Sequence, residues 1–427
     1  MNTIDPRGGR LSGATPSALA AYERALAAFL SWRSGAEAPL AQAIGEAPGF
    51  VMAHALAAYL LIGSRDPQRV RAAAPRLAAA AALRSDDHER LHLAAIERVL
   101  ADDYAGAVAA LDAALRERPR DVLALAMASA LDYLGGESAR LRERVERVLP
   151  AWPSDLPGYR SVRVMHASGL VECGEVERGE DAALAALAID GTDARAHHAM
   201  AHVFETTDRC ADGVRWLNRH AQAWGSATVV ATHCWWHLAL FHLAHGEHDA
   251  ALALYDRRVR AGGSGEVADL IDASALLWRL RLHGVDGAAR WGELATAWAA
   301  RVDDAYCSFS DLHAMIAFVG ARDEANAQRL LQRLARSQRQ PTRHGESTRL
   351  LGLAACHALL AFGRGDHALA ITLLASLPAR VHRLGGSHAQ RDVLHLTLLH
   401  AVQAIRRPAR RARAMPRKRE GVLHEMR

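Results

Sequence analysis

The chain has 427 residues, half of them hydrophobic, so it is long enough to bury a large core. Its net charge of +5 comes from the end of the chain: residues 406–427 hold nine Arg or Lys and two Glu, whereas the rest carries 43 basic and 45 acidic residues. A nucleic-acid-binding surface needs a basic excess on the folded part, so this distribution argues against nucleic acid as a partner. No apolar run approaches about 18 residues without a charge or a histidine, so we expect no membrane-spanning helix.

The two ends differ in composition from the body of the chain. Residues 1–14 are polar and lack the apolar core of a signal peptide, and we expect them to be disordered. Residues 406–427 are expected to form a basic disordered tail, and residues 15–405 a single domain. The five cysteines are odd in number and have no CxxC spacing, which predicts reduced thiols and a cytoplasmic location.

Abundant Ala and Leu with few strand signals predict an all-α fold. The first helix is expected over Ala18–Trp32, after Thr15 and Pro16, because proline suits a helix start. The helices that follow are predicted at 52–62, 68–83, 89–100 and 104–116. A longer loop is expected at 152–158, an interruption at 337–347 and a last helix at 387–406.

One turn pattern recurs along the chain: a helix ends at a Gly- or Asp-containing turn, and a second helix opens with a small residue about five positions later. The clearest turns follow one another at steps of about 33 to 38 residues, with one longer step, and contain Asp102, Gly174, Asp208, Gly246, Gly284 and Gly365. These copies resemble the tetratricopeptide repeat (TPR). That resemblance implies a small residue seven positions before each turn residue, and Ala95, Ala167, Ala201, Ala239 and Ala358 fit, whereas Leu277 does not.

Longer strings narrow the resemblance. HHAMAHVFE, ATHCWWHLALFHLAHGE, DLIDASALLW and GGSHAQRDVLHLTLLHA are similar to the family named after tetratricopeptide repeat protein 38, over about residues 12–405. The resemblance implies a TPR-like α-solenoid, a right-handed superhelix of about eight or nine antiparallel helical hairpins. It implies no particular biochemical activity.

Two stretches rich in histidine are the candidates for a site. Residues three and four positions apart share one face of a helix, which groups Arg195, His198, His202 and Glu205 on one stripe. The helix one repeat later places His233, Trp236 and His237 on a comparable stripe. In a TPR stack these positions line the concave groove, and Trp278 continues its wall.

Three interpretations of these stripes remain open. The groove binds a peptide, a protein segment or a small ligand, with Trp236 and Trp278 as apolar anchors and Glu205 taking a cation. Alternatively, it holds a divalent metal ion, which would make the groove a metal-binding or hydrolase-like active site; the ligands would be His198, His202 and Glu205 with His233 or His237. In the third interpretation, the histidines only bond neighbouring helices to one another.

Other polar residues carry weaker signals. Asp272 lies near the head of a helix and fits the groove or a helix cap, and Asp311 with His313 suggests a pair in the groove. His388 and Asp392 share one helical face, which reaches the groove if the superhelix curls back. Three further histidines are expected in the interior: His92, His166 and His357. The sequence does not predict an oligomeric state.

Overall fold

The computed structural model describes the backbone of residues 3–414, and the side chains of that range except those of 378–379 and 407–414. The described part is all-α apart from an antiparallel hairpin of β1 (Thr3–Ile4) and β2 (Arg10–Leu11) and a single bridge between Arg33 and Thr228. Within this range no helix combines the length and the apolar character needed to cross a membrane.

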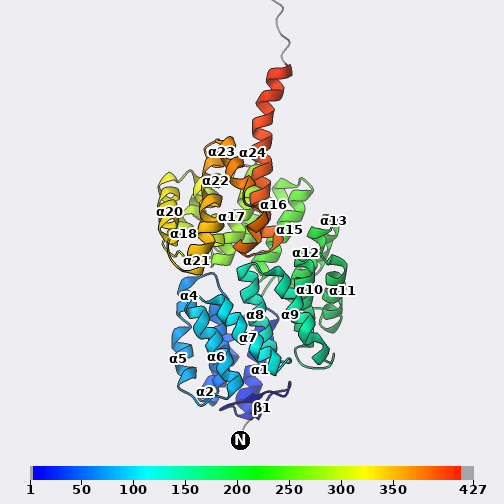
Figure 1. Ribbon diagram of the computed structural model, residues 1–427. Helices are drawn as coiled ribbons and strands as arrows, with labels where there is room; N and C mark the ends of the chain where they lie inside the picture. Colours follow the sequence, from blue (N-terminus) through cyan, green and yellow to red (C-terminus); the bar gives the residue numbers. More distant parts are fainter. Residues whose placement is uncertain (1–2, 415–427) are drawn as a thin grey trace, which may run out of the picture.

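The helices form two tiers joined along one side (Figure 1). The tier nearer the N-terminus contains α1 (Pro16–Leu30), α2 (Glu37–Glu46), α3 (Val51–Ile62), α4 (Pro67–Arg71), α5 (Ala74–Ala81), α6 (Asp87–Leu100), α7 (Tyr104–Glu117), α8 (Val122–Gly135), α9 (Ser138–Val148) and the 3₁₀ turn η1 (Leu149–Ala151). The connecting side contains α10 (Tyr159–Glu172), α11 (Val176–Ile189), α12 (Ala194–Thr206), α13 (Cys210–Arg219) and α14 (Ala221–Trp224).

The other tier completes the chain. It contains α15 (Ala231–Ala244), α16 (His248–Leu254), the π-helical turn η2 (Tyr255–Val259), α17 (Val267–Leu282), α18 (Ala289–Ala299), α19 (Ser308–Ala321), α20 (Glu324–Ser337), α21 (Arg343–Ser347), the π-helical turn η3 (Thr348–Gly352), α22 (Leu353–Gly363), α23 (His367–Ala375), the 3₁₀ segment η4 (Pro378–Leu384) and α24 (His388–Ala414).

The recurring turn of the sequence joins the two helices of each hairpin. The predicted turn residues all have positive φ: Asp102 (62°), Gly174 (82°), Asp208 (56°), Gly246 (73°), Gly284 (86°) and Gly365 (81°). This left-handed conformation ends a helix, and it favours glycine or, next best, asparagine and aspartate. The five alanines predicted where paired helices touch are all completely buried. Leu277 is also buried, at 1% exposure, so that hairpin accommodates the larger side chain.

Local signals explain where several helices begin. The Thr15 hydroxyl accepts the Ala18 amide at 3.2 Å, and α1 starts at Pro16 as predicted. The helix predicted over 68–83 is instead divided into α4 and α5, because Pro75 cannot donate the backbone hydrogen bond that would continue α4.

Residues 3–14 are ordered, so the prediction of a disordered N-terminal segment is wrong for this part. Arg7 forms an ion pair with Glu23 of α1, Leu11 is buried, and the Ser12 amide donates to Glu89 at 2.8 Å. Gly8 turns the hairpin with a φ of 88°. These contacts with α1 and α6 compensate for strands too short to be stable alone.

The predicted tail differs as well. Helix α24 continues to Ala414, beyond the expected end of the domain at 405, because Ala and Arg are strong helix formers. Residues 415–427 lie outside the described range.

Segments far apart in the sequence meet between the two tiers. The hydroxyls of Tyr104 and Tyr306 are 2.7 Å apart, and the Arg343 amide donates to Asp102 at 2.8 Å. The start of α24 reaches back to α8, where the Tyr133 hydroxyl donates to Gln390 at 2.9 Å. The chain thus returns on itself, and Figure 1 shows α24 lying between α22 and α15.

Candidate metal centre

Four histidines of α12 and α15 converge. His198 and His202 are one helical turn apart on α12, whose first turn is capped by Asp193 through the Ala196 amide at 3.0 Å. His233 and His237 have the same spacing on α15. One ring nitrogen from each of the four lies within 4.8 Å of the others. We call this group the four-histidine cluster.

The imidazole rings face one another closely. The Nε2 atoms of His198 and His202 are 3.0 Å apart, so one N–H donates to the lone pair of the other nitrogen. Ring centroids range from 4.5 Å between His202 and His237 to 6.4 Å between His202 and His233. Neither ring nitrogen of the buried His237 has a hydrogen-bond partner among the described residues. Such unpaired buried nitrogens are costly, which makes them candidates for ligating an ion.

Carboxylates stand behind three of the imidazoles. Asp272 of α17 accepts the Nδ1–H of His233 at 2.8 Å, which leaves the Nε2 of His233 free for the cluster. Oε2 of Glu205 lies 3.8 Å from Nδ1 of His202 and 3.6 Å from Nδ1 of His237. Carboxylates in this position orient histidine ligands and increase their basicity.

Three of the four histidines, His198, His202 and His237, are held in the neutral state. Burial, reinforced by the neighbouring histidines, lowers the pKa of His202 to about 3 and the pKa values of His198 and His237 well below normal. Burial also raises the pKa of Glu205 to about 8, although the side chain is 26% exposed, because protein atoms surround it closely. Neutral imidazoles keep the lone pairs that a metal ion requires.

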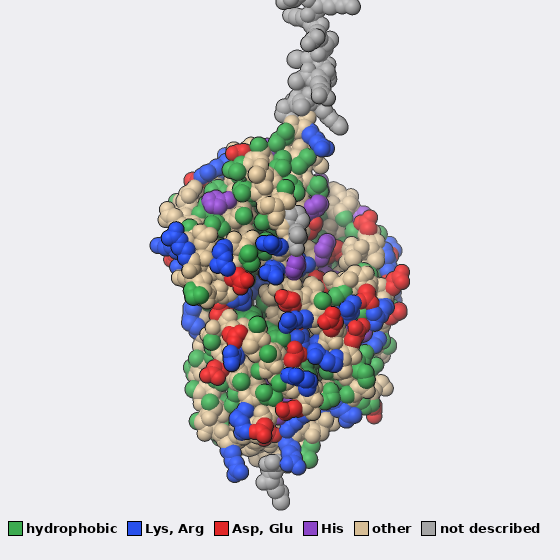
Figure 2. All heavy atoms as spheres, in the orientation of Figure 1, with side chains coloured by type: hydrophobic (Ala, Val, Ile, Leu, Met, Phe, Trp, Pro, Cys, Tyr) green, Lys and Arg blue, Asp and Glu red, His purple; other side chains and the backbone are tan. Residues whose placement is uncertain are grey.

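One side of the cluster reaches the surface. His237 is fully buried, but 13% of the His202 and 16% of the His233 side chain are exposed. Figure 2 shows histidine side chains at the surface in the region where α24 passes α12 and α15. On the other side, the Arg195 guanidinium lies 4.7 Å from the ring centre of Trp32, which in turn lies 5.5 Å from the ring of His198.

The two tryptophans expected to anchor a partner are part of the core instead. Trp236 is completely buried and stacks on His233 with ring centres 5.1 Å apart. Trp278 is also buried and donates its Nε1–H to Thr397 of α24 at 2.8 Å. Because α24 covers this wall, neither indole is accessible to a peptide, and the expectation of exposed apolar anchors is wrong.

The predicted ligand set also changes in detail. His198, His202 and His233 come together as predicted, but His237 takes the fourth position and Glu205 lies behind the rings.

His313 is buried on α19, outside the cluster, and donates its Nδ1–H to the backbone carbonyl of Phe309 at 2.7 Å. Asp311 bonds to His344 at 2.7 Å, so the expected pairing of Asp311 with His313 is wrong.

The first turn of α24 lies beside the cluster, in agreement with a chain that curls back. His388 is exposed and Asp392 half-buried, and both act electrostatically on the cluster, His388 on His202 and Asp392 on Glu205. Gln390, which sequence reasoning did not single out, donates to Asp272 at 3.3 Å. Gln390 lies two residues after His388, and residues two apart do not share a helical face, so the sequence gave no reason to expect Gln390 near the groove.

The remaining expectations concern isolated residues. His92 and His166 are buried as predicted, whereas His357 is exposed, so its assignment to the interior is wrong. All five cysteines are free thiols.

No known family model matches the chain, so the resemblance to the family of tetratricopeptide repeat protein 38 stays an expectation.

Proposed function

We propose that this protein binds a divalent transition-metal ion through His198, His202, His233 and His237. The observation that carries the proposal is the convergence of four imidazoles, with nitrogens within 4.8 Å of one another and carboxylates behind three of them. Nitrogen ligands around a tetrahedral zinc ion are about 3.4 Å apart, so small side-chain rotations suffice. An all-imidazole set suits zinc, copper, nickel or iron.

The exposed side of the cluster would give a further ligand access to the metal ion. If three histidines ligate the ion, the fourth position is available to a small ligand or a peptide side chain arriving from the surface. A peptide, a protein segment or a small molecule would therefore bind through the metal ion, because the buried tryptophans offer no separate docking surface.

Hydrolysis is a second candidate, favoured by Glu205 next to two of the imidazoles. A zinc ion held by the cluster would lower the pKa of a water molecule toward 7, and Glu205, behind the rings of His202 and His237, would orient those two ligands. We expect the zinc-loaded protein to hydrolyse an activated ester such as p-nitrophenyl acetate, and Glu205→Gln to reduce the rate about 10–100-fold. Equal rates for the two proteins would remove this candidate and leave metal binding intact.

The proposal is tested by elemental analysis of protein purified without a histidine tag, followed by Co²⁺ titration monitored by visible absorption. The triple variant His198→Ala/His202→Ala/His233→Ala should lose one bound ion per chain and keep its helical circular dichroism. The matched control is His242→Ala/His245→Ala, which removes two histidines near the end of α15, outside the cluster. Equal Co²⁺ binding by the wild type and the triple variant would overturn the proposal.

We further propose that the fold is a TPR-like α-solenoid and that the protein is cytoplasmic. The solenoid is supported by hairpins that repeat with the same left-handed turn and the same buried alanine. The cytoplasmic location is supported by five unpaired cysteines.

A further inference from the structure

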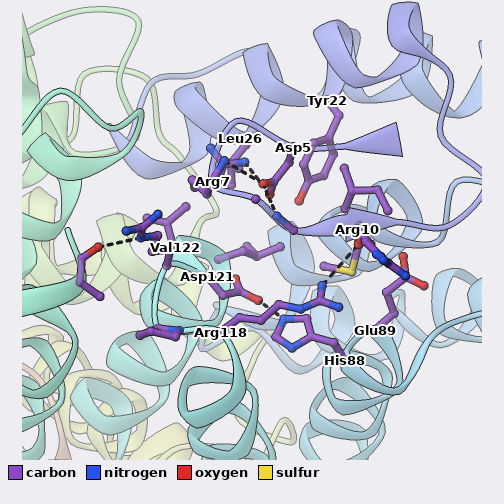
Figure 3. A pocket seen from close by; sticks show the side chains of 18 residues that line it. Asp5, Arg7, Arg10, Tyr22, Leu26, His88, Glu89, Arg118, Asp121 and Val122 are labelled. Carbon is purple, nitrogen blue, oxygen red and sulfur yellow. Dashed lines mark hydrogen bonds and ion pairs between the residues drawn. The ribbon is translucent and has the colours of Figure 1, made fainter. Parts of the chain in front are cut away.

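A pocket of about 350 Å³ lies between the N-terminal hairpin and the helices α6 and α8, far along the chain from the four-histidine cluster. Its wall includes Arg7 and Tyr22 on one side and His88, Arg118 and Asp121 on the other (Figure 3). Most of the charged groups are already paired: Arg7 with Glu23, for example, and Arg118 with Asp86 at 3.0 Å. His88 and Asp121 are the lining residues whose side chains are placed to ligate a metal ion.

His88 and His92 are one helical turn apart on α6, and both direct Nε2 at the same oxygen. Oδ2 of Asp121 lies 2.7 Å from Nε2 of His88 and 2.8 Å from Nε2 of His92. Oδ1 of Asp121 accepts the Ala124 amide at 2.8 Å and so caps α8, which fixes the orientation of the carboxylate. The three ligand atoms lie within 4.8 Å of one another.

The far nitrogens of these histidines also have suitable surroundings. The Tyr59 hydroxyl lies 3.0 Å from Nδ1 of His92. Nδ1 of His88 is buried without a hydrogen-bond partner, and its nearest carboxylate oxygen, Oε2 of Glu117, is 3.6 Å away. When Nε2 ligates a metal, Nδ1 carries a proton that needs an acceptor, and Tyr59 and Glu117 stand where those acceptors are required. The contact of His88 with Asp121 alone does not explain why Nδ1 of His88 is buried without a hydrogen-bond partner.

We propose that His88, His92 and Asp121 form a second site for a divalent transition-metal ion. Two histidines and one carboxylate on a single face are a ligand set used for iron(II), and they also accept manganese, cobalt or zinc. Two of the three residues, His88 and Asp121, line the 350 Å³ pocket, which has room for water or a small ligand beside the ion. This site is independent of the proposed function and shares no ligand with it.

The experiment titrates Co²⁺ into the full chain by isothermal calorimetry and visible absorption. The wild type should bind two ions, and the triple variant that removes the four-histidine cluster should bind one. Adding Asp121→Asn to the triple variant should weaken the remaining site about 10–100-fold or abolish it. Asparagine caps a helix as well as aspartate does, so α8 should stay folded.

The matched control is His344→Gln in the triple variant. His344 is a buried histidine bonded to an aspartate at 2.7 Å, but it lacks a second imidazole on the same oxygen, so its removal should leave the remaining ion bound. Absence of Co²⁺ binding by the triple variant, or binding that Asp121→Asn leaves unchanged, would overturn this second site. A wild type that binds one ion, lost with Asp121→Asn and retained in the triple variant, would instead overturn the four-histidine site.

Discussion

Two pairs of histidines one turn apart, His198 with His202 on α12 and His88 with His92 on α6, differ in where their carboxylates stand. In the four-histidine cluster Glu205 and Asp272 lie behind the rings, so nitrogen lone pairs face one another. At the α6 site Asp121 lies among the ligands and accepts both N–H groups. The first arrangement leaves both ring nitrogens of His237 without a hydrogen-bond partner among the described residues, whereas in the second both Nε2 atoms are already bonded to Asp121. We therefore expect the four-histidine cluster to bind metal more tightly, and the α6 site to contribute more to stability without metal.

The largest expected effect tests this contrast in stability. Asp121→Ala removes a helix cap worth about 1 kcal/mol and leaves two buried imidazole N–H groups unpaired at about 1–3 kcal/mol each, so the free energy of unfolding should fall by about 3 kcal/mol or more. Urea denaturation in the presence of a chelator measures it. Asp121→Asn keeps the capping oxygen but puts an NH2 group in place of the shared acceptor Oδ2, so its loss should be smaller only by the contribution of the cap, about 1 kcal/mol. A loss below about 1 kcal/mol for Asp121→Asn would contradict the assignment of Asp121 as a shared acceptor.

A histidine outside both sites provides a reference for acid sensitivity. Burial lowers the pKa of His313 to about 4, although the bond to the Phe309 carbonyl opposes the shift. A lowered folded-state pKa means that the contribution of neutral His313 is complete above pH 6.5 and decreases as the pH falls from 6.5 toward 4, by on the order of 3 kcal/mol. His313→Leu should remove this part of the acid destabilisation, measured by urea midpoints at several pH values. An unchanged pH dependence would show that His313 does not titrate in this way.

The next effect concerns the carboxylate behind His233. Asp272→Asn keeps the shape of the side chain but removes the charge that orients the imidazole, so metal affinity at the four-histidine cluster should fall about 10–100-fold. Competition between the protein and a chromophoric chelator for Zn²⁺ measures the change. The α6 site serves as the internal control, because Asp272 does not contact it. An equal loss at both sites would point to a general change of the fold.

The smallest effect lies one contact further away. Gln390→Leu removes the hydrogen bonds to Asp272 and Tyr133, which should cost about 1 kcal/mol of stability and reduce Zn²⁺ affinity at the four-histidine cluster a few-fold. The same chelator competition measures it, with Gln338→Leu, on the distant α20, as the control. An effect as large as that of Asp272→Asn would mean that the start of α24 itself supplies a ligand.

Much of the helical pattern and part of the site followed from the sequence, because both depend on local periodicity. Helical spacing places His198 and His202 on one face whatever surrounds them, and the turn residues require a left-handed backbone. The fourth member of the cluster depends on side-chain packing between helices, so the sequence counts Glu205 among the ligands and gives His237 only as an alternative to His233.

The α6 site was missed for a related reason. His88 and His92 have the same spacing as His198 and His202, and that signal was available, but the sequence analysis places His92 in the interior and does not single out Asp121. Only the fold brings a helix cap 29 residues away from His92 onto its ring. The burial of Trp278 likewise depends on α24 packing against α17, a long-range contact that no local pattern encodes.

The contact of Gln390 with Asp272 has a consequence for the order of folding. Because 118 residues separate the two, the aspartate that orients His233 gains this hydrogen bond only after the start of α24 has docked on α17. A chain clipped before Ser387 would present the four imidazoles without that support.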